Sequence, residues 1–504
     1  MKKKLMNKQI RKLLEHCKQI SLLGKVSALA HWDLEVNLPP KASEERAAQL
    51  AYLTSIRTDL WLAKDFRSII EDVDVSKLDQ KEKAIVRNLR DSAKFYYKVP
   101  KEIIIKEVET TSKAFMAWKK AKEENNFKDF LPHLKQIIDL DLIIANHLGY
   151  KKNPYDALLD LYEPGLTAEF CGKIFNGLQP ELTTLIKQIQ KTKRFKNKSG
   201  LVGGDKNYPE QDQKQIALYV LRKMGYDLDA GRLDTAPHPF ETKLGRHDIR
   251  ITTHYHVNDF LDSLMGVMHE AGHAMYEQGV SEEYTNTPLQ GGVSLGIHES
   301  QSRFWENQVG RSMEFVKFIA PVFQAFYAGQ LGKTSTEELF AAVNDVRPGL
   351  IRVEADEVTY NLHVVLRFEI ENALMNKKIK PDDLPEIWRT KMKKYLGIVP
   401  ATDREGVLQD IHWSHGSFGY FPTYTLGNLY AAQFAAAMRK KLVIEDLVER
   451  GEFGTILSWL RSNIHQHGSL YWPDELVKKV TGQALSPKFF LRYLKDKYAK
   501  IYEL

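Results

Sequence analysis

Residues 257–279 read VNDFLDSLMGVMHEAGHAMYEQG, and this stretch predicts a helix that carries the chemistry of the protein. Its apolar residues recur three and four positions apart, as on one face of a helix; they are Phe260, Leu261, Leu264 and Met268. Asn258 or Asp259 can cap the N-terminus of this helix, and Gly279 can end it.

Two histidines, His269 and His273, lie four residues apart and therefore point the same way on this helix. Two imidazoles placed in this way can bind one metal ion at about 2.0–2.1 Å. Glu270 is rotated by about 100° from His269, so it does not ligate the metal but can act as a general base on a metal-bound water. The apolar, helical setting favours a metal site over a structural pair of histidines.

A catalytic site of this type needs a third protein ligand and one open position. The extended motif with a third histidine is absent, so a carboxylate from elsewhere must serve. The nearby candidates are Glu277, Glu282, Glu283, Glu299 and Glu306. We predict Glu299 as the third ligand. Enough residues separate it from His273 for the chain to form a loop and turn back toward the metal helix, and it opens a second helix. Its alternative role is to stabilise the N-terminus of that second helix through the helix dipole. We expect the other four carboxylates to face solvent.

Helical periodicity dominates the rest of the chain, and strand patterns are sparse. The clearest helical segments are residues 9–23, 46–60, 81–98, 167–191, 211–224, 312–328, 355–375 and 430–439. Residues 248–256 alternate and are rich in β-branched and aromatic side chains, which predicts a strand directly before the metal helix. We interpret residues 193–207 as an exposed loop rather than a domain boundary, because helical patterns continue on both sides.

The composition is that of an ordinary foldable protein. The 504 residues are 43% hydrophobic and 27% charged, with a formal net charge of +7 that is spread along the chain, so we expect no nucleic-acid partner. Two cysteines, Cys17 and Cys171, indicate a reducing compartment. Charged residues follow the basic start at residues 1–4, and no run of about 18 apolar residues occurs. We therefore predict a cytoplasmic protein with no secretion signal and no membrane span.

Six short motifs, in order along the chain, resemble those of the carboxypeptidase Taq family of thermostable-type metallocarboxypeptidases. They are His238-Pro239-Phe240, Asp248-Ile249-Arg250-Ile251-Thr252, His269-Glu270-Ala271-Gly272-His273, His298-Glu299-Ser300-Gln301, Ile351-Arg352-Val353-Glu354-Ala355-Asp356 and Gly406-Val407-Leu408-Gln409-Asp410-Ile411-His412-Trp413. The N-terminal stretch from Trp32 to Arg46 is also similar to this family. None of the six departs from the family pattern, and the resemblance covers essentially the whole chain.

The resemblance implies a mainly α fold, with a large helical body, a deep active-site groove and a small β-sheet next to the metal-binding helix. It implies a single metallocarboxypeptidase domain over residues 1–504, in which two helical lobes can flank the groove, and a homodimer. The implied activity is removal of single C-terminal residues from peptides with broad specificity. The implied metal ligands are His269, His273 and Glu299, with Glu270 as the catalytic glutamate.

Recognition of a free C-terminal carboxylate calls for a guanidinium group, which offers two parallel hydrogen bonds. Arg352 is our first candidate for this contact, and Arg250 is our second. Each can instead form a structural ion pair, with Asp356 or Asp248 as the partner. His238 can line the substrate pocket or stabilise a turn bounded by proline.

Peptide hydrolysis also needs a hydrogen-bond donor to the tetrahedral oxyanion. The stretch that begins at the end of the last motif is dense in candidates. Related helical metallopeptidases, such as angiotensin-converting enzyme, look similar here and place a histidine and a following tyrosine at the oxyanion. We choose His415 and Tyr420, with His412 and Tyr424 as alternates that the sequence does not separate.

We expect one divalent ion per chain. Zinc is the first choice, because two imidazoles and a carboxylate suit it, but cobalt and manganese fit the same donors. The closest alternative function is a helical-groove oligopeptidase or dipeptidyl carboxypeptidase. A remote alternative is a non-catalytic protein that binds metal or peptides, which the intact motifs disfavour.

Overall fold

The computed structural model describes residues 6–197 and 200–504, so the basic start at residues 1–4 and Lys198 lie outside the described residues. The chain forms two compact units. Unit 1 comprises Met1–Tyr97, Gly200–Val343 and Phe434–Ala484, and unit 2 comprises Lys98–Ser199, Asn344–Gln433 and Leu485–Leu504. One division between the units therefore falls inside residues 193–207, the segment that we interpreted as a loop; this segment also contains a short helix, α9 (Lys193–Lys196).

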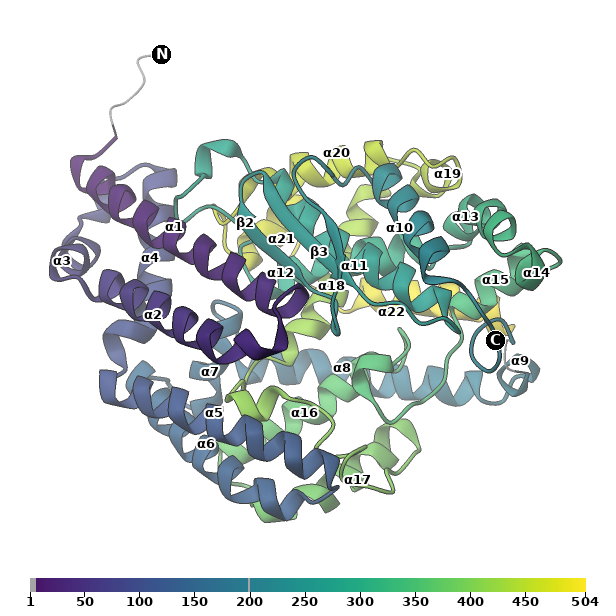
Figure 1. Cartoon of the computed structure of the whole chain (residues 1–504), viewed down its shortest axis with the longest axis horizontal. Coiled ribbons are helices and arrows are strands. Elements are labelled where there is room, and N and C mark those ends of the chain that lie inside the picture. Colours follow the sequence, from purple (N-terminus) through teal and green to yellow (C-terminus); the bar gives the residue numbers. More distant parts are fainter. Residues whose placement is uncertain (1–5, 198–199) are drawn as a thin grey trace. The chain divides into compact units, whose positions relative to one another are not determined.

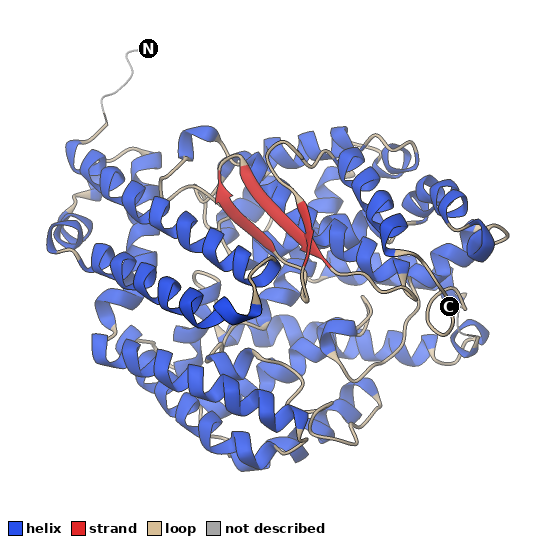
Figure 2. Ribbon diagram, in the orientation of Figure 1, coloured by secondary structure: helices blue, strands red, loops and turns tan. Residues whose placement is uncertain are grey.

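Unit 1 consists of helices around one small sheet (Figures 1 and 2). Its helices are α1 (Lys8–Val36), α2 (Ser43–Leu62), α3 (Lys64–Asp72), α4 (Gln80–Lys98), α10 (Glu210–Met224), α11 (Phe260–Gly279), α12 (Leu295–Arg303), η4 (Phe304–Gly310), α13 (Met313–Phe326), α14 (Ala328–Leu331), α15 (Thr336–Val343), α19 (Ile444–Glu449), α20 (Phe453–Asn463) and α21 (Pro473–Thr481). The segment η4 is a π-helix that continues α12.

Among its described residues, unit 2 contains helices, turns and connecting segments but no strand. Its main helices are α5 (Lys101–Glu123), α6 (Phe127–Leu148), α7 (Pro154–Tyr162), α8 (Ala168–Ile189), α16 (Tyr360–Met375), α17 (Leu384–Leu396) and α22 (Lys488–Tyr502), with the short 3-10 turns η5 (Arg352–Glu354) and η7 (His412–His415). The helix α18 (Pro422–Met438) begins in unit 2 and ends in unit 1.

The predicted mainly α class, with a small sheet beside the metal helix, is confirmed. The periodic segments coincide with α1, α2, α4, α8, α10, α13, α16 and α18. Several predicted boundaries are wrong; for example, α1 runs beyond residue 23 to Val36, and α12 begins at Leu295 rather than at Glu299. The helix α16 begins only at Tyr360, because the Asp356 carboxylate accepts the backbone N–H groups of Val358 and Thr359 and so holds the preceding turn. The helix α18 begins earlier than predicted, at Pro422, because proline is well suited to the first position of a helix.

The sheet consists of β1 (Leu233–Thr235), β2 (Glu241–Gly245) and β3 (Asp248–Thr253), in the order β1-β3-β2. The central strand β3 runs parallel to β1 and antiparallel to β2. Along it the fully buried Ile249 and Ile251 alternate with the half-buried Asp248 and Arg250. We predicted a strand over residues 248–256, but β3 ends at Thr253, three residues before the predicted end. His254 begins the connection to α11.

The helix α11 packs against the sheet, α10, α12 and η4, and most of its side chains are buried. Of the two residues predicted to cap the N-terminus of α11, Asp259 is the cap. Its carboxylate accepts the backbone N–H groups of Leu261 and Asp262 at 3.0 and 3.1 Å. At Gly272 the helix touches the backbone of α12: a Cβ there would lie 2.5 Å from the carbonyl oxygen of Gln301. The missing side chain therefore sets how closely α11 approaches α12.

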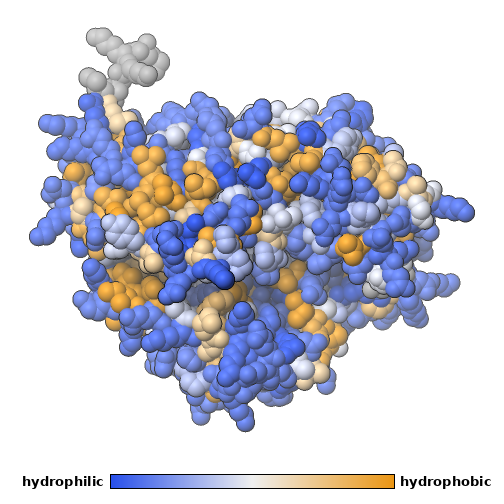
Figure 3. Space-filling model, viewed as in Figure 1, coloured by the Kyte–Doolittle hydropathy of each residue, from blue (hydrophilic) through white to orange (hydrophobic). Residues whose placement is uncertain are grey.

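One face of the surface is largely hydrophilic, with hydrophobic side chains gathered over α1 (Figure 3). Along α1 the side chains of Leu22, Val26 and Leu29 recur at helical spacing and are 47%, 54% and 45% exposed. Among the described residues, no helix combines the length and the apolar character that crossing a bilayer requires.

Replacing Gly272 with alanine should force α11 and α12 apart. We expect the free energy of unfolding to fall by about 1–3 kcal/mol, the usual cost of overpacking. Gly266 is the matched control, because it lies on the same helix and a Cβ there would meet nothing within 4 Å. Gly266→Ala should leave stability unchanged or raise it, since alanine favours a helix. Denaturant unfolding measures both variants, and equal stabilities would contradict the role of the close contact.

Candidate active site

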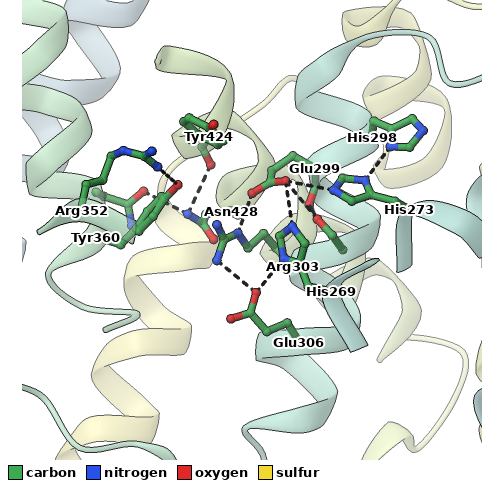
Figure 4. Close-up of polar contacts among 12 residues, drawn as sticks. His269, His273, His298, Glu299, Arg303, Glu306, Arg352, Tyr360, Tyr424 and Asn428 are labelled. Carbon is green, nitrogen blue, oxygen red and sulfur yellow. Dashed lines mark hydrogen bonds and ion pairs between the residues drawn. The ribbon is translucent and has the colours of Figure 1, made fainter. Parts of the chain in front are cut away.

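The helix α11 presents His269 and His273 to Glu299 on α12 (Figure 4). The Nε2 atom of His269 lies 3.5 Å from Oε2 of Glu299, and Nε2 of His273 lies 3.4 Å from the same oxygen. One possible ligand atom from each of the three residues lies within 4.8 Å of the others. The structure thus brings together the three residues that the sequence predicted as metal ligands.

These distances fit a tetrahedral metal ion. Two ligands that each lie about 2.0–2.1 Å from a tetrahedral centre are about 3.3–3.4 Å apart, close to both measured separations. The electrostatics also favour positive charge here: although burial lowers it, the carboxylates of Glu299 and Glu306 raise the pKa of His269 to about 10. Two imidazoles and one carboxylate also form a donor set of catalytic zinc sites. The residues present therefore fit a divalent cation.

Two charged side chains on α12 and η4 hold His269 and Glu299 in place (Figure 4). Arg303 donates from Nε to Oε1 of Glu299 at 2.7 Å and from Nη1 to Oε2 of Glu306 at 3.0 Å. Nδ1 of His269 lies 2.9 Å from Oε2 of Glu306, which leaves Nε2 for a metal. Such a carboxylate orients a histidine ligand and raises its basicity. Our expectation that Glu306 faces solvent is wrong, because the widened π-helical turn carries it into the interior.

His273 is the first member of a chain of hydrogen-bonding side chains. Its Nδ1 lies 2.5 Å from Nδ1 of His298, and Nε2 of His298 lies 3.1 Å from Oε1 of Glu277. Lys243 on β2 donates to the other oxygen of Glu277 at 2.7 Å. With Nε2 of His273 on a metal, its Nδ1–H donates to His298, which in turn donates to Glu277. Our expectation that Glu277 faces solvent is also wrong: it is 5% exposed, and Lys243 compensates its charge.

Glu270 lies beside the two histidines in the sequence but outside the trio of ligand atoms. Its side chain is buried, and burial raises the pKa of its carboxyl group to about 7. A group whose pKa lies near neutrality can both accept and return a proton at neutral pH. The position and environment of Glu270 therefore suit a general base.

Unit 2 contains a second buried polar cluster, around Arg352 of η5 (Figure 4). Arg352 donates from Nη2 to Asp410 at 2.9 Å, from Nε to the same carboxylate at 3.2 and 3.3 Å, and from Nη1 to the Tyr360 hydroxyl at 3.0 Å. The fully buried Arg367 forms an ion pair with the same Asp410. The partner of Arg352 is therefore Asp410 rather than Asp356. Two guanidinium groups share one carboxylate, which leaves one positive charge in excess.

The alternates for the oxyanion, His412 and Tyr424, lie in this second cluster. Nε2 of His412 lies 3.3 Å from the Tyr424 hydroxyl, and the guanidinium of Arg352 lies 4.8 Å from the centre of the Tyr424 ring. Burial lowers the pKa of His412 to about 3, so its imidazole is neutral. Of our first choices, His415 is exposed, whereas the Tyr420 ring packs beside both alternates, with its centre 5.3 Å from that of His412 and 5.2 Å from that of Tyr424.

The two remaining candidates for substrate contact lie in and beside the sheet. Arg250 donates from Nε and Nη2 to the two oxygens of Asp248 at 2.8 and 2.9 Å, and its guanidinium covers the ring of Trp32. Arg250 therefore forms the structural ion pair that we named as its alternative role, and this ion pair occupies the Nε and Nη2 donors of its guanidinium group. His238 is exposed in the connection between β1 and β2.

Sequence reasoning missed the residues that support the ligands. His298 and Arg303 flank Glu299 at one and four positions, and a search of the turns around the predicted ligand could have found them. Lys243 gave no such signal, because it reaches Glu277 from a different element. Glu282 and Glu283 are exposed, as expected.

Known proteins resemble this chain along nearly its whole length. Residues 12–498 match the family described as carboxypeptidase Taq (M32) metallopeptidase. The chain is 41% identical over 495 residues to thermostable carboxypeptidase 1 of Pyrococcus furiosus, covering 98% of this chain and 99% of that protein. It is 39% identical over 493 residues to carboxypeptidase 1 of Bacillus subtilis, covering 97% of each.

A solved structure agrees with these relatives. The M32 carboxypeptidase from Deinococcus radiodurans R1 matches the fold with a TM-score of 0.94 at 35% identity, covering 99% of this chain and 100% of that chain. Fold and sequence thus point to one family and one activity. The chain belongs to the carboxypeptidase Taq (M32) family of metallopeptidases, and it is a peptide hydrolase of the carboxypeptidase type that uses a divalent metal ion.

Proposed function

We propose that this carboxypeptidase releases single C-terminal residues from peptides with broad specificity, by attack of water on the terminal peptide bond. One observation carries the proposal: Nε2 of His269 and Nε2 of His273 each lie at tetrahedral spacing from Oε2 of Glu299, and the buried Glu270 follows His269 on the same helix. The broad specificity rests on the family resemblance. The alternative function is a helical-groove oligopeptidase or dipeptidyl carboxypeptidase, and the products of the reaction distinguish it from the proposed one.

In the proposed mechanism, His269 and His273 would hold a divalent cation through Nε2, and Glu299 would hold it through its carboxylate. When bound, the cation would supply Lewis-acid polarisation of the scissile carbonyl and would acidify a water molecule. The Glu270 carboxylate takes the proton from the attacking water and returns it to the leaving amine. Its pKa, raised by burial to about 7, suits both transfers.

We propose that Arg352 recognises the terminal carboxylate of the peptide. The supporting observation is the charge of its cluster, in which Arg352 and Arg367 share the single carboxylate of Asp410. A buried positive charge in excess is costly, and a substrate carboxylate would compensate it. Arg250 is less suited, because it forms its ion pair with Asp248 alone, and this pair carries no positive charge in excess.

We propose His412 and Tyr424 as donors to the oxyanion, in preference to His415 and Tyr420. A neutral buried imidazole and a phenol are donors that need little reorganisation when negative charge develops. The low pKa of His412 and its 3.3 Å contact with Tyr424 support this assignment. The exposure of His415 argues against it, since water weakens a hydrogen bond to a charge there.

The remaining assignments are proposals of the same kind. We propose zinc as the catalytic ion, one per chain, with cobalt or manganese as possible substitutes in the same donors. We also propose that the whole chain works as one catalytic domain, in the cytoplasm, and as a homodimer. The exposed apolar side chains of Leu22, Val26 and Leu29 offer a surface that a second copy would cover.

Glu270→Gln keeps the shape of the side chain and removes the base. We expect kcat to fall by about 10²–10⁴-fold, the usual contribution of general acid–base catalysis. Metal content, measured by plasma mass spectrometry, should not change. Glu282→Gln alters an exposed carboxylate just beyond α11 and should retain wild-type turnover. A metal-loaded Glu270→Gln enzyme with nearly wild-type turnover would rule out this role.

Arg352→Gln should lower kcat/KM for peptides with a free C-terminus by about 10–100-fold, because a hydrogen bond to a charged group is worth about 1.5–3 kcal/mol. Peptides with an amidated C-terminus should be poor substrates of the wild type and should lose little further activity in the variant. Arg250→Gln is the matched control and should have a smaller effect on both peptides.

Mass spectrometry of the products completes this test. Shortening by one residue at a time is the expected pattern. Equal cleavage of free and amidated peptides would contradict carboxylate recognition, and release of dipeptides would favour the alternative function.

His298→Ala should weaken metal binding by about 10–100-fold, the usual effect of removing a partner of a histidine ligand. The physical reason is that Nδ1 of His273 loses the group that fixes its tautomer and ring orientation. Competition with a chromophoric chelator measures the affinity, and His247→Ala, which alters an exposed histidine near β3, is the control. Equal affinities of the two variants would show that His298 does not orient the ligand.

A further inference from the structure

A second group of metal-binding side chains lies at the N-terminal end of α11. His254 and His256 follow β3, and Asp262 lies in the first turn of the helix, about two turns before His269. One possible ligand atom from each lies within 4.8 Å of the others. We propose that His254, His256 and Asp262 bind a second divalent transition-metal ion, which is distinct from the catalytic ion.

The distances suit one ion after small side-chain movements. Nε2 of His254 lies 2.9 Å from Oδ2 of Asp262, and Nε2 of His256 lies 3.8 Å from the same oxygen. These separations lie on either side of the about 3.3–3.4 Å between two ligands of a tetrahedral zinc ion. The ion replaces the contact between His254 and Asp262 and draws His256 inward. The three side chains are 31%, 56% and 49% exposed, so an ion reaches them from solvent and keeps water as its remaining ligands.

The backbone beneath these side chains is fixed by one buried residue. Gln213 of α10 donates from Nε2 to the carbonyl oxygen of His256 at 2.9 Å, and its Oε1 accepts the hydroxyl of Ser263 at 2.6 Å. The backbone N–H of Asp259 donates to the same carbonyl of His256 at 3.0 Å. The end of the strand and the first turn of the helix therefore keep their spacing, and ion binding requires rotation of surface side chains only.

The donor set determines the class of ion. Two imidazoles and one carboxylate suit Zn²⁺, Co²⁺, Ni²⁺ and Cu²⁺, whereas Mg²⁺ and Ca²⁺ prefer oxygen ligands. Asp262 supplies negative charge, and the nearby Asp259 carboxylate adds to it. Glu306 and His298 contact the Nδ1 atoms of the two catalytic histidines. Partners of this kind raise the affinity of a site for its metal by about 10–100-fold. The second site is therefore the weaker one.

Binding at this second site joins β3 to α11, the helix that carries two of the catalytic ligands. An ion that binds the folded protein and not the unfolded chain stabilises it by mass action. The second ion therefore acts on stability, and its effect grows with the concentration of free metal above that which fills the catalytic site.

The test uses the full-length holoenzyme, dialysed until it holds one ion per chain. Equilibrium dialysis against Zn²⁺ should show a second equivalent, and the melting temperature should rise with the zinc concentration, whereas Mg²⁺ should do neither. His256→Gln and Asp262→Asn should each weaken the second equivalent by at least about 10-fold. Both should retain the first ion and the hydrolysis of peptides. His247→Gln, the control, should still bind two ions.

Two results would overturn the proposal. One is a wild-type protein that stops at a single zinc ion per chain when free zinc is in large excess. The other is a second equivalent that persists with unchanged affinity in both His256→Gln and Asp262→Asn. Because His256 is exposed, His256→Gln decides the matter alone if the aspartate variant fails to fold.

Discussion

The burial of several carboxylates around α11 governs how the candidate active site is built. Glu270, Glu277, Glu299 and Glu306 are each less than a tenth exposed. Buried carboxylates persist only when they are paired or when they bind a metal. Arg303 and Lys243 supply fixed partners at hydrogen-bonding distance, and the imidazoles of α11 provide the place where a cation completes the charge. A divalent cation held there would serve the electrostatics of the site as well as its chemistry.

The fold of unit 1 serves this arrangement. The proposed metal ligands come from two helices, α11 and α12, and the close approach of these helices depends on the absence of a side chain at Gly272. The sheet contributes Lys243 from β2, and the π-helical turn of η4 contributes Glu306. The Nδ1 atoms of His269 and His273 thus contact side chains from two different elements, and such contacts would fix the tautomers and ring orientations that the proposed metal binding requires.

The sequence was sufficient for the parts of the site that depend on local spacing. The 3.6-residue period predicts that His269 and His273 share one face of a helix. The number of ligands that a catalytic metal ion requires predicts a carboxylate from the next part of the chain. The burial of Glu277 and Glu306 could not be predicted, because it depends on which elements pack over them. The same holds for Arg352, whose partner Asp410 is remote in the sequence. The choice between His412 and His415 depends on exposure within a single short turn, which periodicity does not reveal.

Anomalous X-ray diffraction at the zinc edge, from crystals of the zinc-loaded enzyme, tests the proposed metal ligands most directly. We expect a strong peak in each chain, about 2.0–2.2 Å from Nε2 of His269, Nε2 of His273 and a carboxylate oxygen of Glu299. A fully loaded enzyme with no peak at these atoms, or with Glu299 turned away from the ion, would contradict this assignment.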